Sequence, residues 1–142
     1  MDVAARERAF LRVAGPDACD YLQRMVSNDV EALPIGEACP ALLLTAKARV
    51  IAPLVVWRRG EEDFLLLTEP ELGEQVRALL VRMRLRARCE IEPEEHTSVL
   101  VFGGDGLATD FPGAHELVDG GLEATLDADE LERRRIEARV PR

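Results

Sequence analysis

The chain contains few lysines and few of the histidines and cysteines that usually bind metals. Among its 18 basic residues Lys47 is the single lysine, and His96 and His115 are the only histidines. Its cysteines are odd in number, lie far apart and form no CxxC pair: Cys19, Cys39 and Cys89. Neither residue type has the spacing of metal ligands, so we expect no metal site. Separate, unpaired cysteines favour reduced thiols and a cytoplasmic protein.

Long hydrophobic runs and excess positive charge are also missing. No apolar run approaches the roughly 18 residues that a membrane-spanning helix needs. The first ten residues, MDVAARERAF, lack the apolar core of a signal peptide. The net charge of −9 and the pI near 4.8 argue against a general nucleic-acid binder, whose binding surface is basic. We therefore expect neither a membrane nor a nucleic acid as partner.

The chain does contain enough apolar residues for a globular fold. The chain has 142 residues, of which 47% are hydrophobic and 32% charged. This length suits one domain with a hydrophobic core, and this composition is not that of a disordered chain.

The local patterns alternate between strands and helices. Residues 8–13 alternate as in a strand, and Gly15-Pro16-Asp17 predicts a helix start. Apolar residues then recur at helical spacing and should face the core: Ala18, Tyr21, Leu22, Met25 and Val26. The helix should end at Asn28-Asp29.

Further strands are predicted at residues 41–44, 50–57 and 63–68, with a hairpin turn between the first two. Glu69-Pro70-Glu71 should open a second helix. From Met83 to Ile91 apolar residues alternate with charges, which predicts a strand, and residues 97–102 predict another. We expect a charged helix at 127–138. The order β-α-β-β-β-α-β favours an α+β fold: an antiparallel sheet with helices on one face, of ferredoxin-like type.

This order of elements, with its Gly-Pro-Asp, Ser27-Asn28-Asp29 and Pro-Ile-Gly punctuation, resembles the first half of the folate-binding YgfZ family. That family is related to the aminomethyltransferase (T protein) of the glycine cleavage system. The similarity spans residues 8–91 and resumes at 135–141, where RIEARVP is similar to the family's R-I-E-A-G-I-P. It implies one folate-binding-type domain over 1–142, with a well-matched ferredoxin-like unit at 1–95 and an abbreviated second part at 96–142.

The resemblance also implies binding residues for tetrahydrofolate. Glu137 stands where relatives place a folate ligand, and Arg8 and Leu131 stand where large side chains flank the pterin. Lys47 and Arg49, on the hairpin, could meet the acidic tail of folate. Plainer alternatives exist for four of these residues. Glu137 is then a solvated glutamate in a charged helix, Arg8 an exposed strand arginine, and Lys47 and Arg49 ordinary turn charges. The arginines at 82, 84, 86 and 88 are interpreted as an anion groove or, more simply, as the solvated face of a strand or a surface that further protein covers.

Four departures limit what the resemblance implies. The sequence stops at Arg142, before the family's K-G-C-Y-x-G-Q-E motif, and the segment from 102 to 131 is short. Arg139 replaces a family glycine. Ala52 and Pro53 stand where the aminomethyltransferases have acids, and neither side chain can move a proton.

We therefore name no catalytic residue and expect a truncated folate-binding module in which tetrahydrofolate binding is weak or absent. In the resembling family such a module supports iron–sulfur cluster assembly or repair. Two alternatives remain: one-carbon transfer to tetrahydrofolate, and a decayed remnant that acts as an interaction domain. A module cut from a larger protein should expose apolar surface, so we also expect a homodimer through the C-terminal third. Its candidate surfaces are the strand at 99–102, with a free edge, and the helix at 131–140.

Overall fold

The computed structural model describes residues 2–44, 49–103 and 106–120. The chain divides into two compact units. Unit 2 comprises residues 8–95, and unit 1 combines residues 1–7 with residues 96–142.

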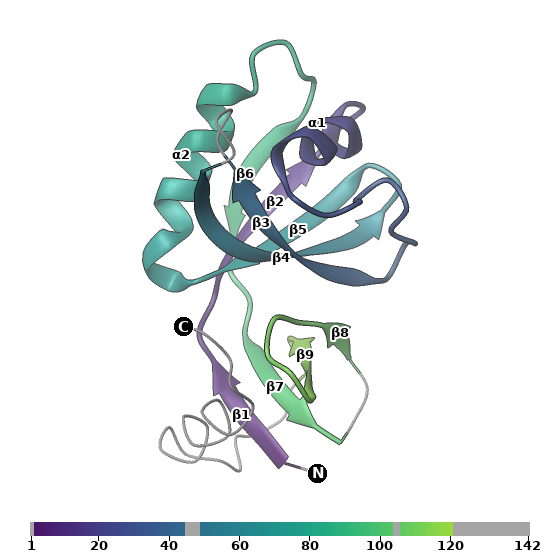
Figure 1. Cartoon of the computed structure of the whole chain (residues 1–142), viewed down its shortest axis with the longest axis vertical. Helices are drawn as coiled ribbons and strands as arrows, with labels where there is room; N and C mark the ends of the chain where they lie inside the picture. Colours follow the sequence, from purple (N-terminus) through teal and green to yellow (C-terminus); the bar gives the residue numbers. More distant parts are fainter. Residues whose placement is uncertain (1, 45–48, 104–105, 121–142) are drawn as a thin grey trace. The chain divides into compact units, whose positions relative to one another are not determined.

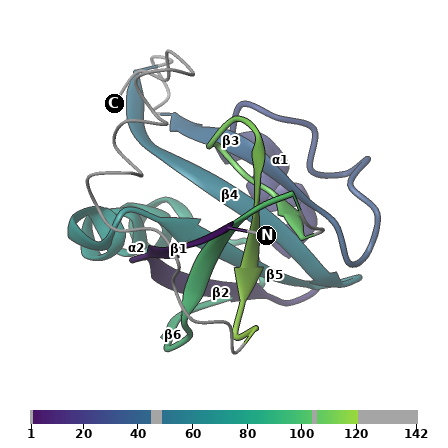
Figure 2. The same ribbon diagram turned by 90° about the horizontal axis from the view of Figure 1, so that it is seen from below.

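Unit 2 is an antiparallel five-stranded sheet with two helices (Figure 1). The strands follow one another across the sheet in the order β3-β4-β5-β2-β6 (Figure 2). In chain order the elements are β2 (Ala9–Ala14), α1 (Ala18–Met25), β3 (Ala38–Leu44), β4 (Val50–Gly60), β5 (Asp63–Thr68), the 3-10 turn η1 (Pro70–Leu72), α2 (Gly73–Met83) and β6 (Glu90–Glu94). The predicted α+β class and the order β-α-β-β-β-α-β are confirmed.

Both helices pack on the same face of this sheet. Alternate strand residues such as Val13, Phe64 and Leu66 are fully buried in one cluster with Tyr21 of α1 and Leu80 of α2. The Tyr21 hydroxyl donates a hydrogen bond of 2.6 Å to the Leu80 carbonyl. The apolar stripe predicted for the first helix therefore packs in one core with helix α2.

The first helix begins later than predicted. The helix starts at Ala18, and Gly15 and Pro16 lie in the turn before it. Gly15 has φ 141°, and a β-carbon there would lie 2.5 Å from the Arg88 carbonyl oxygen. The Asp17 carboxylate does not cap its own helix but accepts the Arg88 backbone N–H at 2.7 Å. Contacts with Arg88, far along the chain, thus determine the conformation of residues 15–17.

The strand predicted from Met83 to Ile91 exists but begins later and lies at Glu90–Glu94. Helix α2 continues through Met83, Leu85 adopts a left-handed conformation with φ 51°, and β6 begins only at Glu90. The Arg84 guanidinium donates to the Cys89 carbonyl at 3.0 Å and closes the turn. The arginines at 82–88 therefore do not form one face of a strand.

Unit 1 contains a four-stranded antiparallel sheet in the order β1-β7-β9-β8. Its strands are β1 (Asp2–Arg6), β7 (Ser98–Phe102), β8 (Leu107–Ala108) and β9 (Ala114–Val118). Ala4, Leu100 and Phe111 form a small buried cluster. Only β7 was predicted. It pairs with β1 on one side and β9 on the other, so the expected free edge at residues 99–102 does not exist.

The predicted hairpin turn falls largely on residues 45–48, and the predicted helix at 127–138 falls wholly after residue 120. Both lie outside the described residues. Within the described part of the chain, no helix is long and apolar enough to cross a membrane.

Candidate functional site

One end of the sheet of unit 2 carries the two predicted folate-binding residues that the structure describes. Arg8 directly precedes β2, and Arg49 directly precedes β4. Strand pairing places Ala9 opposite Thr68 and Thr68 opposite Leu54, so the starts of β2 and β4 lie at the same end of the sheet. We call this the Thr68 end. Arg8 is half-buried there and Arg49 is exposed.

The other three predicted site residues lie outside the described residues: Lys47, Leu131 and Glu137. The structure therefore brings Arg8 and Arg49 to one end of the sheet, on strands that β5 separates. It does not test whether a folate pocket forms around them.

Ala52 and Pro53 occupy two different environments on β4. Ala52 is fully buried among the core residues beneath the helices. Pro53 is exposed, and its carbonyl accepts a hydrogen bond of 2.9 Å from the Thr68 hydroxyl. Of the two positions where the resemblance predicts acids, only residue 53 can meet a ligand.

Exposed apolar side chains occur on β3 and β4 at the Thr68 end. Pro53 pairs with Leu42 of β3, whose side chain is 38% exposed, and Val50 at the start of β4 is 52% exposed. These side chains can pack against a flat ring but cannot donate or accept a proton. Chemically, the Thr68 end offers apolar contact and arginine charge.

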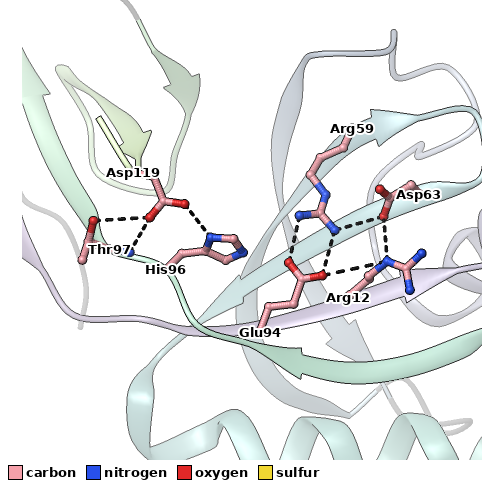
Figure 3. Close-up of polar contacts among 7 residues, drawn as sticks. All are labelled: Arg12, Arg59, Asp63, Glu94, His96, Thr97 and Asp119. Carbon is pink, nitrogen blue, oxygen red and sulfur yellow. Dashed lines mark hydrogen bonds and ion pairs between the residues drawn. The ribbon is translucent and has the colours of Figure 1, made fainter. Parts of the chain in front are cut away.

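An ion network on the sheet of unit 2 is a feature that the sequence reasoning missed. Arg59 donates to Glu94 at 2.9 Å and to Asp63 at 3.1 Å (Figure 3). Arg12 lies 3.6 Å from Asp63 and 3.9 Å from Glu94. Burial alone would lower the pKa of Arg59, but its hydrogen bonds to Glu94 and Asp63 raise it above its usual value. The network ties β2, β4, β5 and β6 together.

Unit 1 contains a histidine–carboxylate pair (Figure 3). Nδ1 of His96 lies 2.6 Å from the Asp119 carboxylate, whose other oxygen accepts the Thr97 N–H at 2.8 Å. The hydrogen bond from the Thr97 backbone, followed by that from His96, lowers the pKa of Asp119. Asp119 has φ 55°, and its own N–H donates to the Thr97 carbonyl, so the contacts fix a turn. They agree with a structural role for His96.

The cysteines do not form a reactive centre. None of the three is in a disulfide, and desolvation by burial raises the pKa of each thiol: Cys19, Cys39 and Cys89. A raised thiol pKa disfavours the nucleophilic thiolate. In the described ranges no group of three or more histidines, cysteines and acids could hold a metal ion.

Comparison with known proteins identifies relatives of this fold. The family model described as "GCVT N-terminal domain" matches residues 3–105. Aminomethyltransferases of Bacillus cytotoxicus and Bacillus mycoides are each 37% identical over 57 residues, which is 40% of this chain and 16% of theirs.

A solved structure extends the likeness to nearly the whole chain. The glycine cleavage system aminomethyltransferase T from Bartonella henselae superposes with a TM-score of 0.69 at 17% identity. The match covers 99% of this chain and 46% of that protein, and at this identity it shows the fold alone. The chain therefore spans less than half the length of the relatives it matches.

Proposed function

This chain belongs to the GCVT N-terminal domain family, and from that membership we propose that it binds a folate without catalysing one-carbon transfer. The observation that carries the second half of the proposal is Pro53. It is the exposed position of the Ala52-Pro53 pair, and it has no group that orients or deprotonates an amine on the folate. Its strand partner Leu42, which is apolar and exposed, supplies none either.

The ligand in this proposal is tetrahydrofolate. Arg49, together with Lys47, contacts the acidic tail of the folate, and Arg8 stacks its planar guanidinium against the pterin. Leu131 flanks the ring and the Glu137 carboxylate accepts hydrogen bonds from pterin N–H groups. The placement of Arg8 and Arg49 at the Thr68 end supports the first part of this assignment.

We expect weak binding, with a Kd of about 0.1 mM or higher, equivalent to about 5 kcal/mol. Arg49 and Pro53 are exposed, so water competes with a ligand at the Thr68 end. Calorimetric titration with 5-formyltetrahydrofolate measures this. Arg49→Gln and Glu137→Gln should weaken binding, whereas Arg77→Gln, on helix α2, should not. A sub-micromolar Kd would overturn the expected weakness, and an unchanged affinity of E137Q would remove Glu137 from the site.

In the cell we propose a cytoplasmic role similar to that of the YgfZ family, in support of iron–sulfur cluster assembly or repair. The likeness to aminomethyltransferases favours a second function, transfer of a one-carbon unit from an aminomethyl donor to tetrahydrofolate. We rank this function second because Pro53 has no group that orients or deprotonates an amine on the folate. Folate-dependent turnover of an aminomethyl-lipoyl donor above background would establish the enzyme instead. A chain with neither binding nor turnover would be a remnant that serves as an interaction domain.

A further inference from the structure

The turn between α2 and β6, residues 84–89, presents positive charge in an acidic protein. From Arg77 to Arg88 the sequence has five arginines and no acid, although the whole chain has a net charge of −9. Arg82 and Arg86 are both exposed. In the part of the chain that the structure describes, neither forms an ion pair. Their guanidinium groups are thus available to carboxylates from outside.

The same turn exposes apolar side chains. Leu85 is 84% exposed, Met83 is 38% exposed and Val81 is 36% exposed. The left-handed backbone of Leu85, with φ 51°, is unfavourable for a residue with a β-carbon. An apolar side chain held outward by a strained backbone is unusual where folding alone would favour glycine or asparagine.

These residues surround an open hollow of about 450 Å³. Met83, Leu85 and Ala87 supply its apolar lining, and the guanidinium-bearing side chains of Arg24, Arg84 and Arg86 complete it. Arg84 is held by its 3.0 Å hydrogen bond to the Cys89 carbonyl. The hollow is large enough for one or two apolar side chains of a partner.

A purely structural explanation accounts for only part of this surface. Arginines near the end of a helix compensate the negative end of the helix dipole, which suits Arg82 and Arg84. Arg86 lies beyond the last turn, and dipole compensation does not require an exposed Leu85. An extended polyanion fits poorly, because a chain of net charge −9 repels it at long range. The lining also lacks an aromatic ring on which bases could stack.

We infer that the hollow at the α2–β6 turn docks a protein segment in which apolar side chains stand between aspartates or glutamates. The apolar side chains enter the hollow beside Leu85, and the carboxylates pair with Arg82 and Arg86 at its rim. Arginine matches carboxylate geometry with two parallel hydrogen bonds, and arginine and methionine are enriched at protein interfaces. This interaction is independent of the proposed folate site.

The test uses the full chain and a fluorescein-labelled synthetic peptide in which Leu and Phe alternate with Asp and Glu. Fluorescence anisotropy should show saturable binding that weakens at least about tenfold in Arg86→Glu and in Leu85→Ser. Arg77→Glu is the matched control: it makes the same charge change on α2, but Arg77 contacts Glu74 at 3.3 Å and does not line the hollow. Its affinity should stay within about twofold of the parent.

Peptide controls separate the two components of recognition. Replacing Leu and Phe by Ser in the peptide, or Asp and Glu by Asn and Gln, should each abolish saturable binding. Absence of binding by the original peptide, or equal losses in all three protein variants, would overturn the inference. So would tighter Arg86-dependent binding of a DNA duplex or of phosphatidylserine vesicles than of the peptide.

Discussion

At the scale of single residues, neighbouring positions on β4 tolerate charge very differently. Ala52 is fully buried, whereas Pro53 is exposed at the Thr68 end. We expect Ala52→Asp to lower the free energy of unfolding by about 3–5 kcal/mol, because it buries a carboxylate without a partner. Pro53→Asp should change it by less than about 1 kcal/mol, because the new carboxylate meets water. Urea denaturation measures both; equal losses would show that residue 53 is not open to solvent.

A second prediction at this scale concerns acid stability. The pKa of Asp17 is lowered, chiefly by the hydrogen bond from the Arg88 backbone, so its folded pKa lies below the ordinary value of 3.8. A depressed carboxyl pKa stabilises the fold fully above the unfolded value, and this contribution is lost as pH falls through the folded value. Asp17→Asn should therefore be less stable than the parent at pH 7, and the difference should vanish below the folded pKa. A difference that persists in acid would assign the effect of D17N to neutral packing.

At the scale of elements, helix α2 packs on strand β2 through a glycine. A β-carbon on Gly73 would lie 2.5 Å from that of Ala9. Alanine is the better helix former by about 1 kcal/mol, yet overpacking costs about 1–3 kcal/mol. Gly73→Ala should therefore destabilise the protein in thermal denaturation. In an Ala9→Gly background the same change should be neutral or stabilising; a loss of equal size in both backgrounds would exclude the contact as its cause.

Elements with local determinants are the ones that the sequence predicts well. Strand β5 was expected at residues 63–68 and occupies Asp63–Thr68, since branched apolar residues fill it and turn residues bound it. At 83–91 the alternation of arginines with apolar residues imitates a strand. The helix continues instead to Met83, because Val76 and Leu80 extend its buried stripe.

Elements and contacts that depend on distant partners could not be predicted. Strand β1 has a weak pattern of its own and forms against β7, far along the chain. The Arg59–Glu94 pair likewise needs the strand order of the folded sheet. For the candidate site, the resemblance indicated Arg8 and Arg49 by sequence position, but the different exposures of Ala52 and Pro53 became visible only with the strand register.

At the scale of the whole molecule, the sheet of unit 2 offers poor edges for self-association. The Leu42 N–H donates to the Ser27 hydroxyl, and the Leu42 carbonyl accepts the Ser27 N–H, so the middle of β3 is covered. Strand β6, at the other edge, carries glutamates and Pro93, which discourage pairing. Any sheet-mediated contact is thus more favourable outside unit 2.

We still predict a homodimer through the C-terminal third, with the segment 131–140 as its remaining candidate surface. Its apolar residues would be covered by a second copy across a two-fold axis. Light scattering at about 50 μM should give about twice the chain mass of 15.7 kDa. A mass of 15.7 kDa that does not change on tenfold concentration would show a monomer. Truncation before residue 131 is the control and should abolish the dimer.

The pairing of β1 with β7 has a consequence for how the protein is made. Arg6 finds its partner Ser98 only after the ribosome has produced all of unit 2. Within unit 2 the entering strand β2 and the leaving strand β6 are neighbours, with Phe10 opposite Glu94. Unit 2 can therefore close first during synthesis, while the N-terminal strand waits unpaired for the last strands of its own sheet. Folding of unit 1 is thus timed by the translation of the segment inserted within it.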